Sequence, residues 1–344
     1  MLTYLKAKGS PFEAGAAMGR FGAQAVREVL MPGAAWATVM AWRGSPALTH
    51  MATLVQHRHP AVWLELEGLA AGLELPLDDV FAWNCRGDVW AMAPDGCTTV
   101  LLPGPGFPVF AHNEDGDPGL VGRCAVAEVA IDGQPRFASL LYPGSLPGHT
   151  VAVTDAGLAI TVNNLRTLHA PAGVPRMVLA RALLEKPSVA QAVALLKTSP
   201  RAGGFHLTLA QAGLRELTSV EFNGALCSAL VVRQPALHAN HMIHPAMAHQ
   251  PQIVTGSSGH RQLHGDALLA QAIRQAGGAV EPLPILFDQG HDRFPIFRDD
   301  AADSDQENTL ATACIQVGAQ DITWQVHTLR SQTPDHRMRN GGAS

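Results

Sequence analysis

The stretch Asp95-Gly96-Cys97-Thr98-Thr99 lies where the pattern of the sequence changes. Residues 1–96 carry apolar side chains at helical spacing, whereas strand-like runs separated by turns follow Cys97. A Gly-Cys bond at such a junction is a candidate self-cleavage site. Scission there would make Cys97 a new N-terminus that carries a thiol and a free α-amine, and such an amine can activate its own side chain. The stretch therefore predicts both a boundary in the fold and a nucleophile.

The order of the remaining segments indicates the fold class. Residues 1–96 are expected to be mainly helical, and most of the chain after Cys97 is expected to form strands. Two helices over 175–185 and 189–197 interrupt the strands, and a third covers 260–276, ending at Gly277-Gly278. This order predicts an α+β fold. The expected strands cover residues 98–102, 108–112, 123–131, 136–142, 151–154, 158–163, 205–210, 216–222, 225–232, 309–317 and 322–328. Asp132-Gly133 predicts a hairpin turn between two of them.

Several sequence blocks occur in the order found in one known family. The chain resembles the acyl-coenzyme A:6-aminopenicillanic acid acyltransferase family of N-terminal-nucleophile (Ntn) hydrolases. The resemblance implies a four-layer αββα sandwich of two antiparallel sheets with an N-terminal helical pro-segment. It covers most of the chain, and the pairing of Gly-Cys-Thr-Thr with Asn-x-Asp is its most specific part. The matching blocks are Gly9-Ser10-Pro11-Phe12-Glu13-Ala14-Gly15, Asp95-Gly96-Cys97-Thr98-Thr99, His112-Asn113-Glu114-Asp115-Gly116, Val162-Asn163-Asn164-Leu165, Val174-Pro175-Arg176 and Ala239-Asn240-His241.

Three parts of the chain are expected from these boundaries. Residues 1–96 would be released as a small subunit on self-cleavage and would stay associated with the rest. Residues 97–332 would form the αββα catalytic domain. Residues 333–344 are polar and Gly-rich, so they are expected to be a frayed tail.

Cys97 is the proposed nucleophile of two reactions. In the uncut chain its thiol would attack the carbonyl of Gly96, and glycine tolerates the strained geometry of a scissile bond. In the mature protein the thiolate would attack an amide or thioester carbonyl and form an acyl-enzyme. A buried apolar side chain is the alternative interpretation of a lone cysteine.

The resemblance gives roles to three further residues. Asp115 would contact the terminal amine and hold the nucleophile. A carboxylate raises the pKa of a nearby amine and keeps more of it protonated, so the role of Asp115 would be to orient the group and not to activate it. Asn240 matches the oxyanion-hole asparagine, and the backbone N–H of Asn163, at the end of a strand, would be the second donor. A turn-capping aspartate and two turn or strand-end asparagines are the structural interpretations of the same residues.

Two residues are weaker candidates for binding substrate. His112 stands where related bile-salt and penicillin V hydrolases carry an arginine, so this chain departs from that pattern. One interpretation of its neighbour Glu114 is that it simply faces solvent. Arg176 could pair with a substrate carboxylate, which guanidinium matches bidentately, or it could cap or pack a helix.

A group of histidines after the expected strand 225–232 raises the question of a metal site. Pro245 and the strand-like run before it break a helix there, and no carboxylate lies nearby in the sequence. A loop rich in imidazole is therefore favoured, and neither a metal nor a cofactor is expected. The group consists of His238, His241, His244 and His249.

Composition narrows the classes of partner. The formal net charge is −5 and no Lys/Arg-rich run occurs, so nucleic acid is not an expected partner. No uninterrupted apolar run reaches the length of a membrane span, and the N-terminus lacks the apolar region of a signal peptide. The five cysteines are scattered without disulfide or metal spacing. A cytoplasmic protein is expected.

The prediction is a self-processing N-terminal cysteine amidohydrolase that cleaves a small N-acyl amide through a thioester acyl-enzyme. Its nearest rival is acyl-coenzyme A-dependent N-acyl transfer on the same acyl-enzyme, with an acyl thioester as substrate. Hydrolysis is favoured because the chain has no Gly-rich phosphate loop and no basic cluster. Two further hypotheses are an unprocessed, non-catalytic binding relative and a papain-like enzyme with a histidine base. The sequence does not decide between a monomer and a homo-oligomer.

Overall fold

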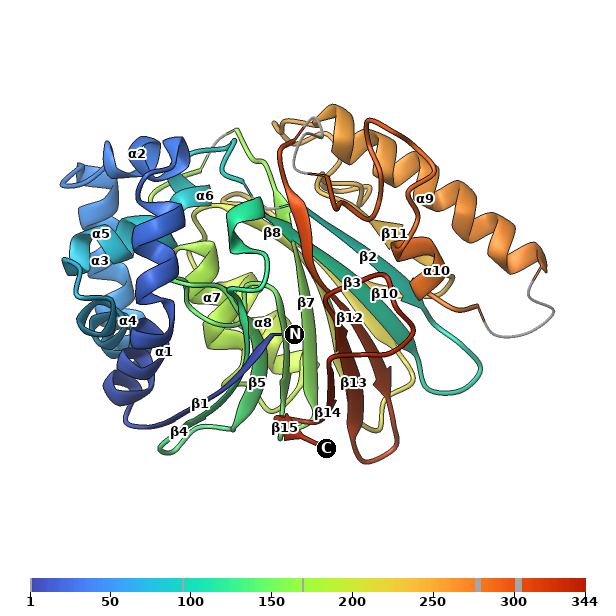
Figure 1. The fold of residues 1–344 in the computed structure, drawn as a ribbon, viewed down its shortest axis with the longest axis horizontal. Coiled ribbons are helices and arrows are strands. Elements are labelled where there is room, and N and C mark those ends of the chain that lie inside the picture. Colours follow the sequence, from blue (N-terminus) through green and yellow to red (C-terminus); the bar gives the residue numbers. More distant parts are fainter. Residues whose placement is uncertain (1, 95, 169, 276–279, 301–304) are drawn as a thin grey trace.

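A computed structural model describes residues 2–94, 96–168, 170–275, 280–300 and 305–344. Asp95 and the expected helix end at Gly277-Gly278 lie outside these ranges. Two β-sheets lie between two groups of helices, one from residues 11–198 and one from residues 256–286 (Figure 1). This arrangement confirms the predicted α+β class and its αββα layers.

The first sheet has eight strands in the order β1-β4-β5-β6-β7-β8-β9-β10. All neighbouring pairs are antiparallel except β1 and β4, which run parallel. The expectation of two purely antiparallel sheets is therefore wrong for this edge of the sheet. The strands are β1 (Thr3–Gly9), β4 (Ala125–Ile131), β5 (Phe137–Leu141), β6 (Val151–Thr154), β7 (Leu158–Leu165), β8 (Gly204–Gln211), β9 (Leu217–Phe222) and β10 (Cys227–Val232).

The second sheet has seven strands in the order β11-β2-β3-β12-β13-β14-β15, all antiparallel. Its strand β2 contacts β7 of the first sheet, so the two sheets share one interior. The strands are β2 (Gly96–Leu102), β3 (Val109–Gly116), β11 (Ala236–His238), β12 (Asn308–Val317), β13 (Ile322–His327), β14 (His336–Arg339) and β15 (Gly342–Ala343).

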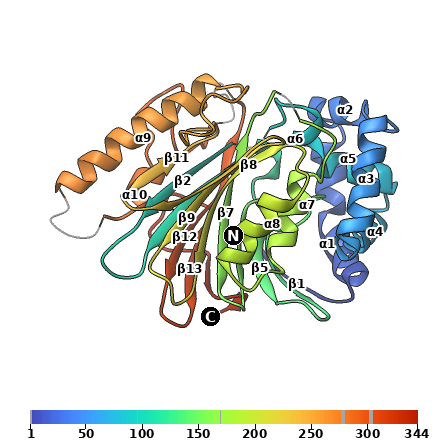
Figure 2. The same cartoon turned by 180° about the vertical axis from the view of Figure 1, so that it is seen from behind.

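Helices cover the outer face of each sheet, as Figure 2 shows from behind. Helix α8 contacts β8, β9 and β10, helix α1 contacts β1 and β4, and α9 and α10 contact the second sheet. The helices are α1 (Pro11–Ala25), the π-helix η1 (Val26–Leu30), α2 (Ala34–Met40), α3 (Pro46–Arg58), α4 (Pro60–Leu73), α5 (Leu77–Asn84), α6 (Arg86–Val89), the 3-10 helix η2 (Pro118–Leu120), α7 (Arg176–Leu183), α8 (Val189–Thr198), α9 (Gly256–Gln275) and α10 (Leu283–Leu286). In the described part of the chain, no helix combines the length and the apolar character that crossing a membrane requires.

Local sequence explains where several elements begin and turn. Helix α1 begins with a capping box, in which Ser10 accepts from the backbone of Glu13 and the Glu13 carboxylate accepts from the backbone of Ser10. The hairpin from β4 to β5 turns at Asp132-Gly133, where Gly133 has φ +74°. That turn was predicted from the sequence.

Two segments differ from the sequence-based expectation. Thr3–Gly9 forms β1 and adds a strand to the first sheet, so the segment 1–96 is not purely helical. The tail from Thr333 to Ser344 was expected to fray, but β14 and β15 extend the second sheet there. Strand β1 pairs with β4, which is distant in sequence, and short-range patterns do not report such a partner. Strands β14 and β15 follow β13 as successive antiparallel strands at the edge of the second sheet.

Helices α1 and α4 approach so closely that only glycine fits at their crossing. A Cβ placed on Gly68 would lie 2.0 Å from the carbonyl oxygen of Phe12, and one on Gly15 would lie 2.1 Å from that of Glu65. We therefore expect Gly68→Ala to push the helices apart and lower the free energy of unfolding by about 1–3 kcal/mol, measured by urea titration. Gly106→Ala is the control, because nothing lies within 4 Å of its Cβ position. Equal stability of both variants would contradict the tight crossing.

Candidate active site

Strand β2 places Cys97 one residue after its start, inside the protein. The thiol side chain is 2% exposed. The antiparallel register pairs Cys97 with Glu114 of β3 and Gly96 with Asp115. Successive side chains of a strand point to opposite faces of the sheet. Cys97 and Glu114 therefore share one face, and Asp115 lies on the other.

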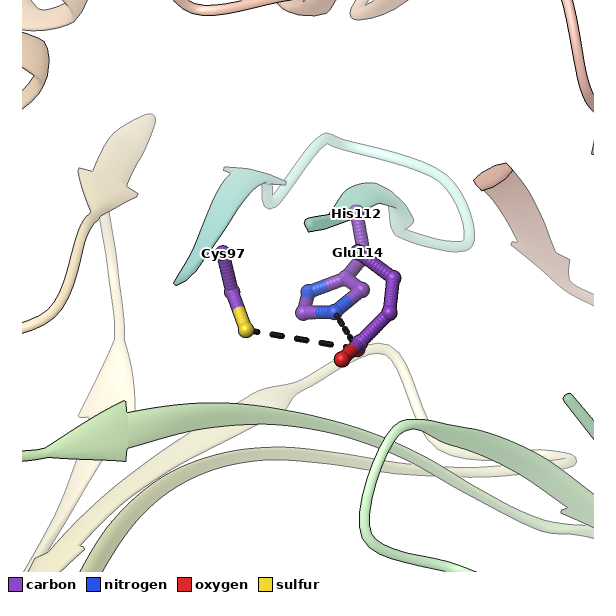
Figure 3. Close-up of side chains that lie close together, drawn as sticks. All are labelled: Cys97, His112 and Glu114. Carbon is purple, nitrogen blue, oxygen red and sulfur yellow. Dashed lines mark hydrogen bonds and ion pairs between the residues drawn. The ribbon is translucent and has the colours of Figure 1, made fainter. Parts of the chain in front are cut away.

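A buried acid and a buried histidine lie beside the thiol (Figure 3). The sulfur of Cys97 is 3.9 Å from Oε2 of Glu114, and this oxygen is 3.0 Å from Nε2 of His112. Glu114 is 2% exposed and His112 is fully buried. Burial lowers the pKa of His112 to about 3. The interpretation of Glu114 as a solvent-facing residue is wrong, because its side chain is buried and its carboxylate lies beside the Cys97 thiol.

The polar chain continues from His112 into the first sheet. Nδ1 of His112 is 2.8 Å from the hydroxyl of Thr99, which donates to Oδ1 of Asn163 at 2.7 Å. The same oxygen is 3.0 Å from Nδ1 of His206, and Nδ2 of Asn163 donates to the carbonyl of His238 at 3.1 Å. Asn163 thus lies within β7, two residues before the strand ends, and its side chain joins the two sheets. The oxyanion role of its backbone N–H stays a prediction.

Asp115 lies beside Gly96 on the face of the second sheet that looks toward α9. Its Oδ1 accepts from the hydroxyl of Thr309 at 2.7 Å, and its Oδ2 is 3.9 Å from Nε of Arg298. A Cβ on Gly96 would lie 2.4 Å from a carboxylate oxygen of Glu307. A side chain at position 96 would therefore displace the Glu307 carboxylate, which pairs with Arg298. The register pairs Asp115 with Gly96, and the alternation of strand side chains puts its carboxylate on the face opposite the thiol. Its contact with a terminal amine stays a prediction.

Asn240 contacts Cys97 directly. Its Oδ1 accepts from the backbone nitrogen of Cys97 at 2.9 Å and from Nη2 of Arg261 at 2.7 Å. Because both partners can only donate, the orientation of the amide is fixed, and Nδ2 donates to the carbonyl of Asn164 at 3.2 Å. The structure thus brings Cys97 and Asn240 together from positions 143 residues apart.

Arg261 of α9 is a site residue that the sequence did not suggest. Its Nη1 donates to the carbonyl of Cys97 at 2.5 Å and to the hydroxyl of Thr98 at 2.8 Å. Burial and then the positive charge of Arg298 lower its pKa, whereas the charges of nearby carboxylates act in the opposite direction. A single arginine in an amphipathic helix carries no sequence signal for such a role. The hydrogen bond of this arginine to the carbonyl of Cys97, 164 residues away in the sequence, becomes evident only from the folded structure.

Arg176, the weaker candidate, is occupied by contacts within the fold. Its guanidinium donates to Oδ1 of Asn164 at 2.5 Å and to the carbonyl of Gly204 at 2.9 Å, and it stacks over Phe205. Its backbone nitrogen donates to Asp88. Arg176 is thus buried at the start of α7 among contacts within the fold, and its pairing with a substrate carboxylate stays a prediction. His112 likewise lies in the buried chain beside Cys97.

The histidines of the group between residues 238 and 249 lie partly in the interior and partly at the surface. His238 shares a hydrogen bond of 2.8 Å with Glu221 and stacks on His206 with ring centroids 3.5 Å apart. Burial would raise the pKa of Glu221, but its contacts with His238 and His244 lower it overall. Glu221 is the carboxylate that the local sequence did not show, and it pairs with this loop from β9.

One group of potential metal ligands stands out among the described residues. The thiol of Cys97, a ring nitrogen of His112 and a carboxylate oxygen of Glu114 all lie within 4.8 Å of one another. A thiolate, an imidazole and a carboxylate suit zinc. However, both nitrogens of His112 are already hydrogen-bonded, to Thr99 and to Glu114, so a metal would have to break the latter bond. The expectation that no metal takes part stays a prediction.

This chain is similar to known proteins over parts of its length. The β-alanyl-dopamine/carcinine hydrolase of Drosophila melanogaster is 28% identical over 163 residues, which are 42% of this chain and 42% of that protein, so the match spans less than half of the relative. A crystal structure of a variant of conjugated bile acid hydrolase from Clostridium perfringens aligns with 71% of this chain and 84% of its own, with a TM-score of 0.38 and 8% identity. A family model matches residues 103–330, a range that holds Asp115, Asn163 and Asn240 and begins after Cys97. Since this match covers more than half of the chain, the protein belongs to the acyl-coenzyme A:6-aminopenicillanic acid acyl-transferase family.

Proposed function

We propose that the chain cleaves itself between Gly96 and Cys97 and then acts as an N-terminal cysteine amidohydrolase on a small N-acyl amide. The observation that carries the proposal is the contact of the Cys97 backbone nitrogen with Asn240 beside a buried thiol. After scission this nitrogen is an α-amine. Its pKa of about 7.7–8.0 lies close to the ~8.5 of a free thiol, so proton transfer between them is nearly thermoneutral.

Asn240 supports the acyl-transfer chemistry through its side-chain amide. Nδ2 carries two hydrogens, and its bond to the Asn164 carbonyl uses one of them. The second can donate to an oxyanion that forms next to Cys97. Preorganised donors of this kind stabilise the developing charge of a tetrahedral intermediate. Arg261, which holds the carbonyl of Cys97, keeps the nucleophile in register with this donor.

Scission would also make room for the substrate. A cavity of about 40 Å³ lies next to the segment that precedes the bond, lined among others by Pro94, Asp117 and Tyr142. Small-molecule sites are typically about 300–1,000 Å³. We propose that the freed end at Gly96 moves aside and enlarges this space.

The cut N-terminal segment would stay bound after scission. Strand β1 pairs with β4 along seven residues, α1 contacts β4, and Glu65 of α4 pairs with Arg181 of α7 at 2.8 Å. Removing this segment would expose the edge of β4 and the apolar residues that it covers. We therefore propose a mature protein of two associated pieces, located in the cytoplasm, where its five free cysteines stay reduced.

The substrate class is proposed from two facts. The chain belongs to a family described as acyl-transferases, and the matched relative is named as a hydrolase of β-alanyl-dopamine and carcinine. Hydrolysis and transfer share one acyl-enzyme and differ in whether water or an amine resolves it. We favour water, with acyl-coenzyme A-dependent transfer as the alternative. An unprocessed relative without activity is the second alternative.

A mass-spectrometric experiment tests this proposal. The purified protein is mixed with a panel of N-acyl amines and acyl thioesters and quenched in acid at short times. The fragment that begins at Cys97 should gain the mass of the acyl group, and N-acyl amines should label it. Labelling by thioesters alone, with release that requires an added amine, would favour acyl transfer. No labelling by any member of the panel would contradict the proposed activity.

A further inference from the structure

We propose that the Glu114–His112 pair takes up the thiol proton of Cys97 when the chain cleaves itself. The inference rests on the proposed self-cleavage and concerns the step that precedes the free amine. In the uncut chain the Cys97 nitrogen is an amide, and an amide nitrogen has no basic lone pair. The thiol therefore needs another proton acceptor for this one reaction.

Distance and burial make Glu114 the acceptor. Its Oε2 is 3.9 Å from the sulfur, and both side chains are 2% exposed. Asp115, the acid that the resemblance suggested, lies on the opposite face of the sheet and contacts Thr309 and Arg298. The register Cys97 to Glu114 thus places one carboxylate on the side of the thiol.

The hydrogen-bond chain behind Glu114 fixes where protons can be. The carbonyl of His238 can only accept, so the Asn163 amide must turn Nδ2 toward it and Oδ1 toward Thr99. Thr99 has one proton and must donate it to that oxygen. Its hydroxyl oxygen then accepts from His112, whose Nδ1 therefore carries a hydrogen.

This order of donors and acceptors requires a single proton between Glu114 and His112. With a hydrogen fixed on Nδ1, a neutral His112 has a lone pair on Nε2, which lies 3.0 Å from Oε2 of Glu114. Two lone pairs at that distance would repel each other, so one proton must lie between the two atoms. The resting pair is thus neutral as a unit, which suits its complete burial.

Self-cleavage conserves every proton and charge in this scheme. The thiol proton passes to the Glu114–His112 pair, which holds two protons and one positive charge while the sulfur attacks the Gly96 carbonyl carbon. A carbon–sulfur bond forms, the carbon–nitrogen bond to Cys97 breaks, and the pair returns one proton to the departing nitrogen. The product is a thioester between Gly96 and the Cys97 sulfur, beside a neutral α-amine. Water then hydrolyses the thioester to a Gly96 carboxyl group and the thiol.

Glu114→Gln separates proton uptake from hydrogen bonding. A glutamine amide can donate to Nε2 of His112, as a protonated Glu114 does, but it cannot take up the thiol proton. We expect self-cleavage to slow by about 10²–10⁴-fold, the range typical of general-base catalysis, while the fold persists. The measurement is the fraction of cut chain in timed gel samples after cell-free synthesis. Glu65→Gln is the matched control, because Glu65 is equally buried but pairs with Arg181 in the helical layer, 2.8 Å away.

Glu114→Asp keeps the carboxylate and covers the case in which the Gln variant does not fold. We expect it to cleave more slowly than the wild type and faster than Glu114→Gln. Equal cleavage by Glu114→Gln and the wild type would overturn the inference. So would equally slow cleavage by the Asp and Gln variants, since this would indicate a requirement for shape alone. A wild-type chain that stays uncut would overturn the proposed function together with this inference, whereas the two preceding outcomes leave the proposed function standing.

Discussion

Cys97→Ala will leave one uncut polypeptide that does not cleave amides. Its thiol is the proposed nucleophile of both self-cleavage and turnover, and alanine offers no group that can attack a carbonyl. The packing of the site should persist, because the backbone nitrogen of residue 97 still donates to Asn240 and its carbonyl still accepts from Arg261. A gel of the purified variant and an activity assay on the preferred N-acyl amide measure both losses.

Cys227→Ala is the control for this variant. Cys227 lies half-buried on the edge strand β10, away from the contacts of Cys97. This variant should be cut and active like the wild type. Residual cleavage of the Cys97→Ala chain at the same bond would show that another group performs the reaction.

Asn240→Ala will depress the acylation rate by about 10²–10³-fold, the usual effect of removing one oxyanion-hole donor. The fold should persist, although Arg261 and the Cys97 nitrogen lose a shared acceptor. Single-turnover kinetics with the acyl-enzyme mass as the readout isolates the acylation step. A normal rate would remove Asn240 from the site.

Asn240→Asp distinguishes the donor from the acceptor role of this side chain. Aspartate can still accept from the Cys97 nitrogen and from Arg261, but it replaces the Nδ2 donor by an oxygen. If the donor stabilises the oxyanion, this variant should be as slow as Asn240→Ala. Acylation at the wild-type rate would show that Asn240 only positions the nucleophile.

Patterns of local sequence predicted most of the fold. The change of pattern at Cys97, the turn at Asp132-Gly133 and the helix pair before β8 all appear in the structure. The nucleophile and Asn240 were paired by the family resemblance, and the structure joins them through a 2.9 Å hydrogen bond. Spacing alone could not supply that pairing, because the two residues come from distant parts of the chain.

The remaining parts of the site depend on the register of strands. Glu114 and Asp115 are neighbours in the sequence, and a shift of one residue in the pairing of β2 with β3 would exchange their faces. The sequence therefore could not say which acid faces the thiol. The partnership of Arg261 with β2 and that of Glu221 with His238 likewise arise from packing between separate elements. The local sequence around a polar residue does not indicate which distant residue its side chain contacts.

Stepwise N-terminal sequencing of purified, active protein tests the central claim most directly. The account predicts a new N-terminus that begins Cys-Thr-Thr, from Cys97, on a fragment of about 26 kDa, with a companion of about 10 kDa in proportion to its 96 residues. Active protein that stays at its full length, with no N-terminus at Cys97, would contradict the account.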